Sequence, residues 1–150
     1  MRIIGGIHKG YKLNQPKLEP TRPTTDLAKE ALFNILDNYF NFDNIRFLDL
    51  FGGTGNISLE FGSRGCSDIT TVELNTEAIK FITKTSEKLE LKGHRILQMD
   101  VFDYIENCRE SFDVIFAGAP YKLPNLAMIP DLIIQKEIIE GQGWFILEHD

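Results

Sequence analysis

Little in this 150-residue sequence points to disulfides, metal sites or membrane segments. It contains two cysteines, Cys66 and Cys108, whose separation matches no metal-binding or redox motif, so we expect two reduced thiols. The three histidines are scattered, and we assign none of them to catalysis or metal binding. No uninterrupted apolar run approaches the roughly 18 residues that a membrane helix needs, and the N-terminus lacks the apolar core of a signal peptide. We therefore expect a cytoplasmic protein without a metal or a membrane partner.

Positive charge is scarce overall but concentrated near the N-terminus. The net charge is −6, yet residues 1–22 hold five basic residues and one acidic residue, so the rest of the chain carries −10. The five basic residues are Arg2, Lys9, Lys12, Lys17 and Arg22. A basic arm on an acidic body is typical of proteins that grip nucleic acid with the arm, although a solvated, lysine-rich hairpin has the same composition.

The chain divides into residues 1–23, a basic arm, and residues 24–150, a single domain. In the arm, apolar pieces at 2–4 and 11–13 flank glycines and predict a small antiparallel hairpin, followed by a proline-rich connector. In the domain, apolar runs alternate with helical patterns, which predicts a doubly wound, parallel α/β sheet. Strands are expected at 46–50, 69–73, 95–99, 112–116 and 144–148, and the helices include 24–39, 75–92 and 126–140. A hydroxyl or carboxylate of Thr24-Thr25-Asp26 is expected to cap the first of these helices, and Asn75-Thr76 the second.

The helix expected from Thr24 carries three apolar pairs on one side. They are Leu27/Ala28, Ala31/Leu32 and Ile35/Leu36, followed by Tyr39. This spacing predicts a buried stripe that packs on the rest of the domain.

The stretch from Arg46 to Asn56 combines an apolar strand, a carboxylate and a glycine-rich turn that opens a helix. Glycines at 52, 53 and 55 allow close approach to a ligand, and the first N–H groups of the helix offer hydrogen-bond donors. Loops of this kind bind nucleotides in many families, and they also occur without a ligand.

Three successive strands end in acids: Asp49, Glu73 and Asp100. Because parallel strands end at one edge of the sheet, we expect these side chains to surround one crevice. They would repel the pyrophosphate of a nicotinamide dinucleotide, since a like-charge pair at 4 Å costs about 4 kcal/mol in a surface-like dielectric. S-adenosylmethionine has no phosphate and carries cationic groups, so it suits the crevice better and a nicotinamide-dependent oxidoreductase is disfavoured.

Each acid has an expected role toward this cofactor. Glu73 would hold the ribose hydroxyls, Asp100 would face the adenine amino group, and Asp49 would lie near the methionine ammonium. Leu74 and Val101 would pack against the adenine ring. The expected cofactor site is completed by Phe51, Gly52, Gly53, Thr54 and Gly55.

Motifs along most of the chain resemble those of the RsmD-type small-subunit ribosomal RNA (guanine-N2)-methyltransferases. They are Arg2-Ile3-Ile4-Gly5-Gly6, Arg22-Pro23-Thr24-Thr25-Asp26, Lys29-Glu30-Ala31-Leu32-Phe33-Asn34, Leu48-Asp49-Leu50-Phe51-Gly52-Gly53-Thr54-Gly55, Ser63-Arg64-Gly65, Val72-Glu73, Phe112-Asp113-Val114-Ile115-Phe116 and Pro120-Tyr121. The resemblance implies a Rossmann-like class I fold and methyl transfer from S-adenosylmethionine to the exocyclic N2 of a guanine in 16S rRNA of the small ribosomal subunit. It further implies that the helix from Thr24 closes over the methionine end of the cofactor. The RNA contacts it implies are Arg2, Lys9, Lys12 and Arg22.

The sequence departs from this family at the expected catalytic motif. The family has Asp-Pro-Pro-Tyr, in which the motif accepts hydrogen bonds from the target amino group and the tyrosine stacks on the base. Here Gly118 and Ala119 replace the acid and the first proline, whereas Pro120 and Tyr121 remain. Losing one aimed polar group typically costs on the order of 10²-fold in rate. We therefore expect cofactor binding with slow methylation, and an RNA-binding or ribosome-assembly factor without catalysis is the alternative.

The sequence also ends just after its fifth expected strand. The resemblance implies a seven-stranded sheet that continues with an antiparallel pair of strands. We expect a piece of a longer protein that is monomeric, with a dimer paired through the exposed edge strand as the alternative.

Overall fold

The computed structural model describes residues 1–18, 24–120 and 122–148. Within these residues the strands are β1 (Phe47–Leu50), β2 (Ile69–Glu73), β3 (His94–Gln98), β4 (Phe112–Gly118) and β5 (Ile139–Glu148). The helices are α1 (Asp26–Asp37), the short 3-10 helix η1 (Phe42–Asn44), α2 (Asn56–Ser63), α3 (Thr76–Lys88), α4 (Val101–Asn107) and α5 (Met128–Gln135).

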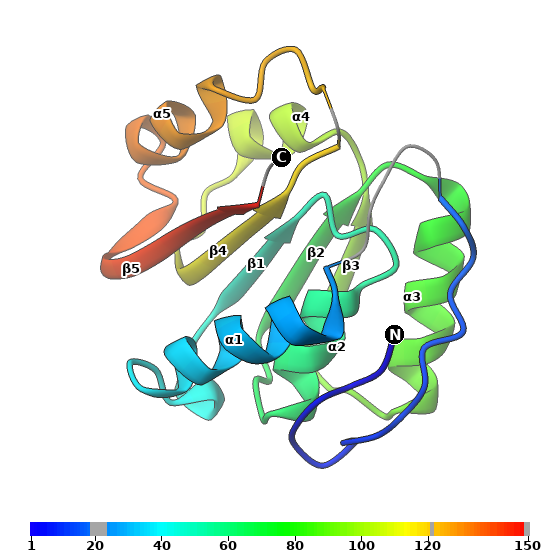
Figure 1. Ribbon diagram of the computed structural model, residues 1–150. Coiled ribbons are helices and arrows are strands. Elements are labelled where there is room, and N and C mark those ends of the chain that lie inside the picture. The colour runs from blue at the N-terminus through cyan, green and yellow to red at the C-terminus, as the bar shows by residue number, and fades with distance from the viewer. Residues whose placement is uncertain (19–23, 121, 149–150) are drawn as a thin grey trace.

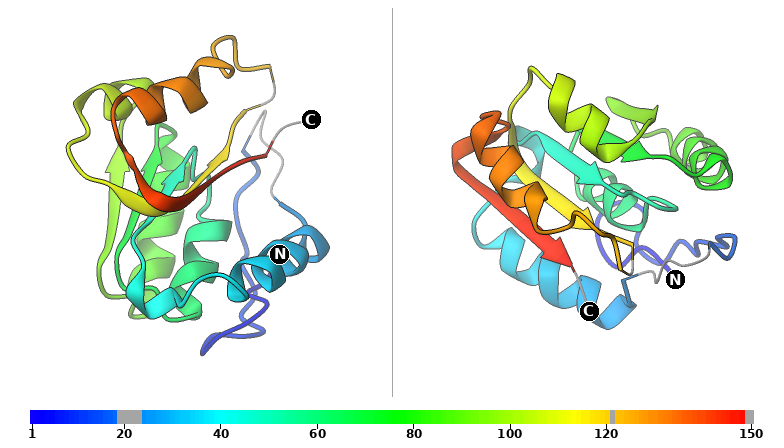
Figure 2. Two further views of the ribbon diagram at one scale, coloured as in Figure 1. Left: turned by 90° about the vertical axis from the view of Figure 1, so that its left-hand side faces the viewer. Right: turned by 90° about the horizontal axis from the view of Figure 1, so that it is seen from above.

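The strands form one parallel sheet in the order β3-β2-β1-β4-β5, which confirms the predicted doubly wound α/β fold. Helices α1, α2 and α3 cover one face and α4 and α5 cover the other (Figure 1). Figure 2 shows the same three layers from the side and from above. The order reverses between β1 and β4, so the chain leaves opposite faces of the sheet after these two strands, which is where ligands bind in such folds.

The central strand β1 is buried along its whole length and serves both faces. Phe47 stacks on Phe61 of α2 with ring centroids 3.7 Å apart, whereas Leu48 and Leu50 belong to the apolar cluster under α4 and α5. This alternation follows from the period of two in a strand. It places Asp49 on the α2 face, at the carboxyl end of the strand.

Local signals at the helix starts are confirmed. The Thr25 hydroxyl accepts a hydrogen bond from the Ala28 N–H, and the Asn75 side chain accepts one from the Ala78 N–H. Both residues therefore act as the N-caps expected from the sequence.

Two expectations about helices are wrong. The helix expected to reach Glu140 ends at Gln135, because the chain turns at Glu137, whose φ is +54°, and enters β5 at Ile139. Helix α1 does pack on the domain, as predicted, but its buried stripe is displaced, and Leu36 is the one member of the predicted pairs that is buried. Leu27 is 80% exposed and Ile35 is 51% exposed. The buried residues of α1 are Lys29, Phe33 and Leu36.

The N-terminal arm pairs with itself as the short antiparallel hairpin that the sequence predicts. Arg2 bridges Lys12, and the N–H groups of Ile3 and Leu13 donate to the carbonyls of Tyr11 and Met1, each at 2.9 Å. The arm backbone is also held by α2. The N–H groups of Ile4 and Gly5 donate to the Glu60 carboxylate, each at 2.9 Å, and the Ser63 hydroxyl donates to the Gly5 carbonyl at 2.6 Å. Among the described helices, none combines the length and the apolar character needed to cross a bilayer.

Candidate functional site

A cavity of about 400 Å³ opens at the carboxyl edge of the sheet, where the chain leaves β1 and β4 toward opposite faces. Its walls come from the arm, the start of α1, the glycine loop and the ends of β4 and β5. The lining residues are Gln15, Pro16, Lys17, Leu18, Thr24, Asp49, Phe51, Gly52, Gly53, Thr54, Asn56, Ile57, Phe116, Gly118 and Glu148.

Asp49 forms the acidic floor of this cavity and is 1% exposed. Its Oδ2 accepts a hydrogen bond of 2.5 Å from the Ser58 hydroxyl, while its Oδ1 is buried with no hydrogen-bond partner among the described residues. Burial raises the pKa of Asp49 to about 7, against the opposing effect of the Ser58 hydrogen bonds, and the charges of Glu73 and Glu148 raise it further. An unsatisfied buried oxygen of this kind is ready to accept a donor from a ligand.

The glycine loop is tied to the end of β2 by Glu73. One Glu73 oxygen accepts from the Gly53 N–H and the other accepts from the N–H groups of Leu74 and Asn75, all at 2.8 Å. The left-handed φ of +82° at Gly55 starts α2, and a Cβ there would lie 2.3 Å from Ile82. The loop therefore needs glycine at this position to reach its observed conformation.

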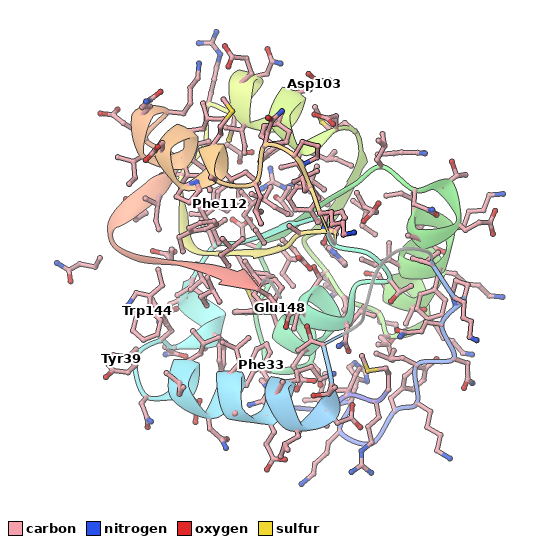
Figure 3. The ribbon with its side chains drawn as sticks, turned by 45° about the horizontal axis from the view of Figure 1, so that its top comes forward. Phe33, Tyr39, Asp103, Phe112, Trp144 and Glu148 are labelled. Atoms are coloured by element: carbon pink, nitrogen blue, oxygen red, sulfur yellow. The ribbon has the colours of Figure 1, made fainter. Side chains whose placement is uncertain are left out.

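The opposite wall brings together the two ends of the chain. Gly118, the last residue of β4, pairs in register with Glu148, the last residue of β5. Figure 3 shows Glu148 at the tip of β5. The Thr24 hydroxyl lies 2.9 Å from both carboxylate oxygens of Glu148, so the start of α1 is fixed to this wall.

The chain is similar to known proteins over nearly its whole length. A family model described as "Conserved hypothetical protein 95" matches residues 1–150. YlbH of Bacillus subtilis (strain 168), whose name marks it as a candidate rRNA methyltransferase, is 36% identical over 100% of this chain and 83% of its own length. Ribosomal RNA small subunit methyltransferase D of Haemophilus influenzae is 31% identical over 99% of this chain and 86% of its own. The solved structure of the hypothetical protein TTHA0928 from Thermus thermophilus has a TM-score of 0.87 and 29% identity, covering 99% of this chain and 85% of its own.

The chain belongs to the RsmD-type methyltransferase family. Its five-stranded parallel sheet is that of a class I methyltransferase, as the resemblance implied. Family membership makes the cavity at the ends of β1 and β4 the candidate active site.

Seven of the residues expected from the sequence line this cavity. They are Thr24, Asp49, Phe51, Gly52, Gly53, Thr54 and Gly118. Of the three strand-end acids, Asp49 alone contributes to the lining. Glu73 lies behind Gly53, and Asp100 caps α4 by accepting a hydrogen bond from the Asp103 N–H. The adenine-binding role expected for Asp100 therefore stays a prediction.

Other expected site residues lie around the cavity rather than in it. Leu74 is 61% exposed beyond Glu73, and Val101 is buried in the cluster under α4. Ala119 and Pro120 follow Gly118 and are half-buried. Arg22 and Tyr121 lie outside the described residues.

The expected RNA contacts of the arm are exposed. Arg2, Lys9 and Lys12 all face solvent, and Arg2 lies 3.5 Å from Asp26 in an open ion pair. Over residues 1–18, 24–120 and 122–148, no group of three or more metal-ligating side chains gathers.

Sequence reasoning missed two walls of the cavity. Glu148 carries the same signal as the three acids that were recognised, because it also ends a parallel strand. No local sequence pattern marked arm residues 15–18 as part of the site, because their position depends on the path that the proline-rich connector takes. One contact that holds them is the hydrogen bond of 2.8 Å from the Thr54 hydroxyl to the Gln15 side chain.

Proposed function

We propose that this protein is an S-adenosylmethionine-dependent methyltransferase that modifies the exocyclic N2 of a guanine in 16S rRNA. The observation that carries the proposal is the cavity that joins the glycine loop after β1 to Gly118 at the end of β4, in a chain of the RsmD-type family. The name of the Haemophilus influenzae relative, a small subunit rRNA methyltransferase, supports the choice of substrate.

The residues of the cavity fit a phosphate-free, cationic cofactor. Asp49 lines the cavity, and its Oδ1, which has no partner among the described residues, suits the methionine ammonium. Gly52 and Gly53 would let the backbone approach the cofactor closely. Thr24 would lie beside the methionine end of the cofactor. Glu73 already accepts three backbone hydrogen bonds, and it would bind the ribose hydroxyls through the lone pair of its carboxylate that remains. When bound, S-adenosylmethionine supplies a methyl group that is already activated toward a nucleophile.

The protein then has to position a poor nucleophile, because the lone pair of an exocyclic guanine amine is delocalised into the ring. Backbone carbonyls at 118 and 119 would orient the amine, and Pro120 and Tyr121 would shape the base pocket. The exposed arm residues Arg2, Lys9 and Lys12 would hold RNA phosphates. The base must leave its stack or come from a loop to enter.

Two measurements test this function. Titration calorimetry should detect binding of S-adenosylhomocysteine but not of NAD, which would exclude the oxidoreductase alternative. Transfer of tritiated methyl groups to small ribosomal subunits that lack the modification should then label 16S rRNA at a guanine N2. Cofactor binding without any transfer would favour the second candidate, an RNA-binding or assembly factor, which the absence of a side-chain acceptor at Gly118 and Ala119 motivates.

A further inference from the structure

The end of β4 offers no side-chain hydrogen-bond acceptor to a bound amine. Residues 118–120 are glycine, alanine and proline. A group that receives methyl on nitrogen must be oriented and must lose a proton, and a pre-aimed acceptor is the usual means. Backbone carbonyls at 118 and 119 can help to orient the amine, but they are too weakly basic to take its proton. An active enzyme would therefore draw the proton acceptor from another element that faces the same cavity.

Glu148 faces that place from the neighbouring strand. It pairs in register with Gly118, and both residues line the cavity. A Cβ built on Gly118 would lie 3.8 Å from Glu148 Oε1, at ordinary contact distance and without overlap. The Glu148 carboxylate thus occupies the space beside position 118 that a side chain from that position would enter.

The other carboxylate of the cavity is less suited to this task. Asp49 is 1% exposed, already accepts a short hydrogen bond from Ser58, and lies on the floor beneath the loop. The Glu148 carboxylate is held from one side by the Thr24 hydroxyl, which lies against one lone-pair site on each oxygen, out of roughly four in all, and fixes the orientation of the carboxylate. The remaining sites can accept N–H groups of a substrate.

We propose that Glu148 is a catalytic residue that accepts the hydrogen bond, and then the proton, of the target amine in place of a side chain at position 118. This inference rests on the proposed methyltransferase function. In the transfer, the amine nitrogen forms a bond to the methyl carbon, and the bond from that carbon to sulfur breaks with its electron pair on sulfur. One N–H proton leaves the nitrogen, and the Glu148 carboxylate takes it and passes it to solvent.

The decisive variants are Glu148→Gln and the double variant Glu148→Gln with Gly118→Asp. Glu148→Gln keeps the shape and the contact with Thr24 but loses the basic carboxylate. It should lower the single-turnover rate of methyl transfer to small subunits on the order of 10²-fold. Gly118→Asp in that background returns a carboxylate to the same space. Its Cβ would lie 3.2 Å from Cε1 on the edge of the Phe116 ring, so the ring must shift by a few tenths of an ångström. We expect the double variant to regain about tenfold or more of the lost rate.

The matched control is Glu87→Gln, which removes the same charge from an exposed position on α3 and should leave the rate unchanged. Calorimetry with S-adenosylhomocysteine supplies a readout independent of turnover. Because Glu148 is assigned to the substrate amine, Glu148→Gln should bind this product within about threefold of the unaltered protein, well below the tenfold that 1.4 kcal/mol represents.

The outcomes separate the inference from the function on which it rests. If the unaltered protein neither binds S-adenosylhomocysteine nor transfers methyl, the proposed function fails and the inference fails with it. If it does both and Glu148→Gln transfers equally fast, backbone carbonyls suffice and this inference alone is overturned. It is also overturned if Glu148→Gln loses product binding but keeps its rate at saturating cofactor. Transfer that appears only when Gly118→Asp is introduced would likewise refute it.

Discussion

The ammonium of Lys29 lies 3.1 Å from the carboxylate of Glu60, and both side chains are completely buried. The three ammonium hydrogens are matched by three acceptors, namely Glu60, the Asn56 side chain at 2.8 Å and the Arg2 carbonyl at 2.6 Å. Glu60 in turn accepts from two backbone N–H groups of the arm and from Arg64 at 2.8 Å. This one pair therefore joins α1, α2 and the arm.

Glu60→Ala should lower the free energy of unfolding by about 3–5 kcal/mol, because it leaves a buried ammonium without its counter-charge and two arm N–H groups without a partner. Burial raises the pKa of Glu60, but hydrogen bonds from Ile4, Arg64 and Lys29 outweigh this and hold it below its ordinary value, so the group is ionised at neutral pH. Urea unfolding at pH 7 measures the change. Glu30→Ala, at an exposed position of α1, should change stability by less than about 0.5 kcal/mol.

The double replacement Lys29→Met with Glu60→Met tests whether this pair contributes more to stability than an ordinary buried ion pair does. Replacing both members of such a pair by apolar residues is often neutral. Here the N–H groups of Ile4 and Gly5 would stay unsatisfied, so the double variant should remain about 2 kcal/mol or more less stable than the unaltered protein. Full recovery of stability would show that the arm does not depend on Glu60.

Binding of S-adenosylhomocysteine should tighten as the pH rises from 6 to 8. The pKa of Asp49 is raised to about 7, so its neutral form dominates at pH 6 and its charged form at pH 8. If the ligand ammonium binds the carboxylate, the affinity should rise about tenfold over this range, following the ionised fraction. Calorimetry at constant ionic strength measures this. In Asp49→Asn the affinity should be weaker and nearly independent of pH, and a flat profile for the unaltered protein would remove Asp49 from the ammonium site.

Stability should fall in mild acid through His94. Burial lowers its pKa from 6.5 to about 4, and the ring is held between the hydroxyls of Thr71 at 2.7 Å and Ser86 at 2.9 Å. The unfolded chain takes up a proton below pH 6.5 and the folded chain does not, so stability is lost as the pH falls from 6.5 toward 4. Between pH 7 and pH 4.5 the loss due to His94 should be about 2 kcal/mol. His94→Gln should unfold in urea with a smaller pH dependence by that amount, and an equal dependence in both proteins would contradict the assignment.

The sheet and the glycine loop could be predicted because their signals are local. The two central strands, β1 and β4, are mostly apolar, and β1 is followed by the glycines of its turn. The caps Thr25 and Asn75 are recognised because the same residue supplies both the side-chain acceptor and the start of the helix. The parallel order then follows from the alternation of strands and helices.

The features that could not be predicted depend on partners far away in the chain. Lys29 looks like a solvent-facing residue, and it is buried because Glu60 lies 31 positions later on another helix. The end of α5 was missed because Glu137 adopts the left-handed conformation without a glycine to mark it. The hydrogen bond from Thr24 to Glu148 joins residues 124 positions apart, so no local sequence pattern predicts it.

The arm should supply most of the salt dependence of RNA binding. Arg2, Lys9 and Lys12 are exposed. The side chain of Arg2 forms an ion pair with Asp26, whose side chain is 38% exposed, and a solvent-exposed ion pair of this kind contributes little to stability. Replacing all three by alanine should therefore preserve the fold, since it is the Arg2 carbonyl that binds Lys29.

Each phosphate contact contributes about 0.7 to 0.9 to the slope of log affinity against log salt concentration, so the triple variant should lose about 2 to 3 units of slope. Fluorescence anisotropy with a 16S rRNA fragment at several salt concentrations measures this. The matched control removes three exposed lysines from α3, Lys80, Lys84 and Lys88, and alters the net charge equally. If the control lowers the slope as much as the arm variant does, the effect reflects total charge and the arm is not the site of RNA contact. If only the arm variant lowers the slope, the RNA phosphates lie along the arm, which continues through Gln15 into the cavity wall.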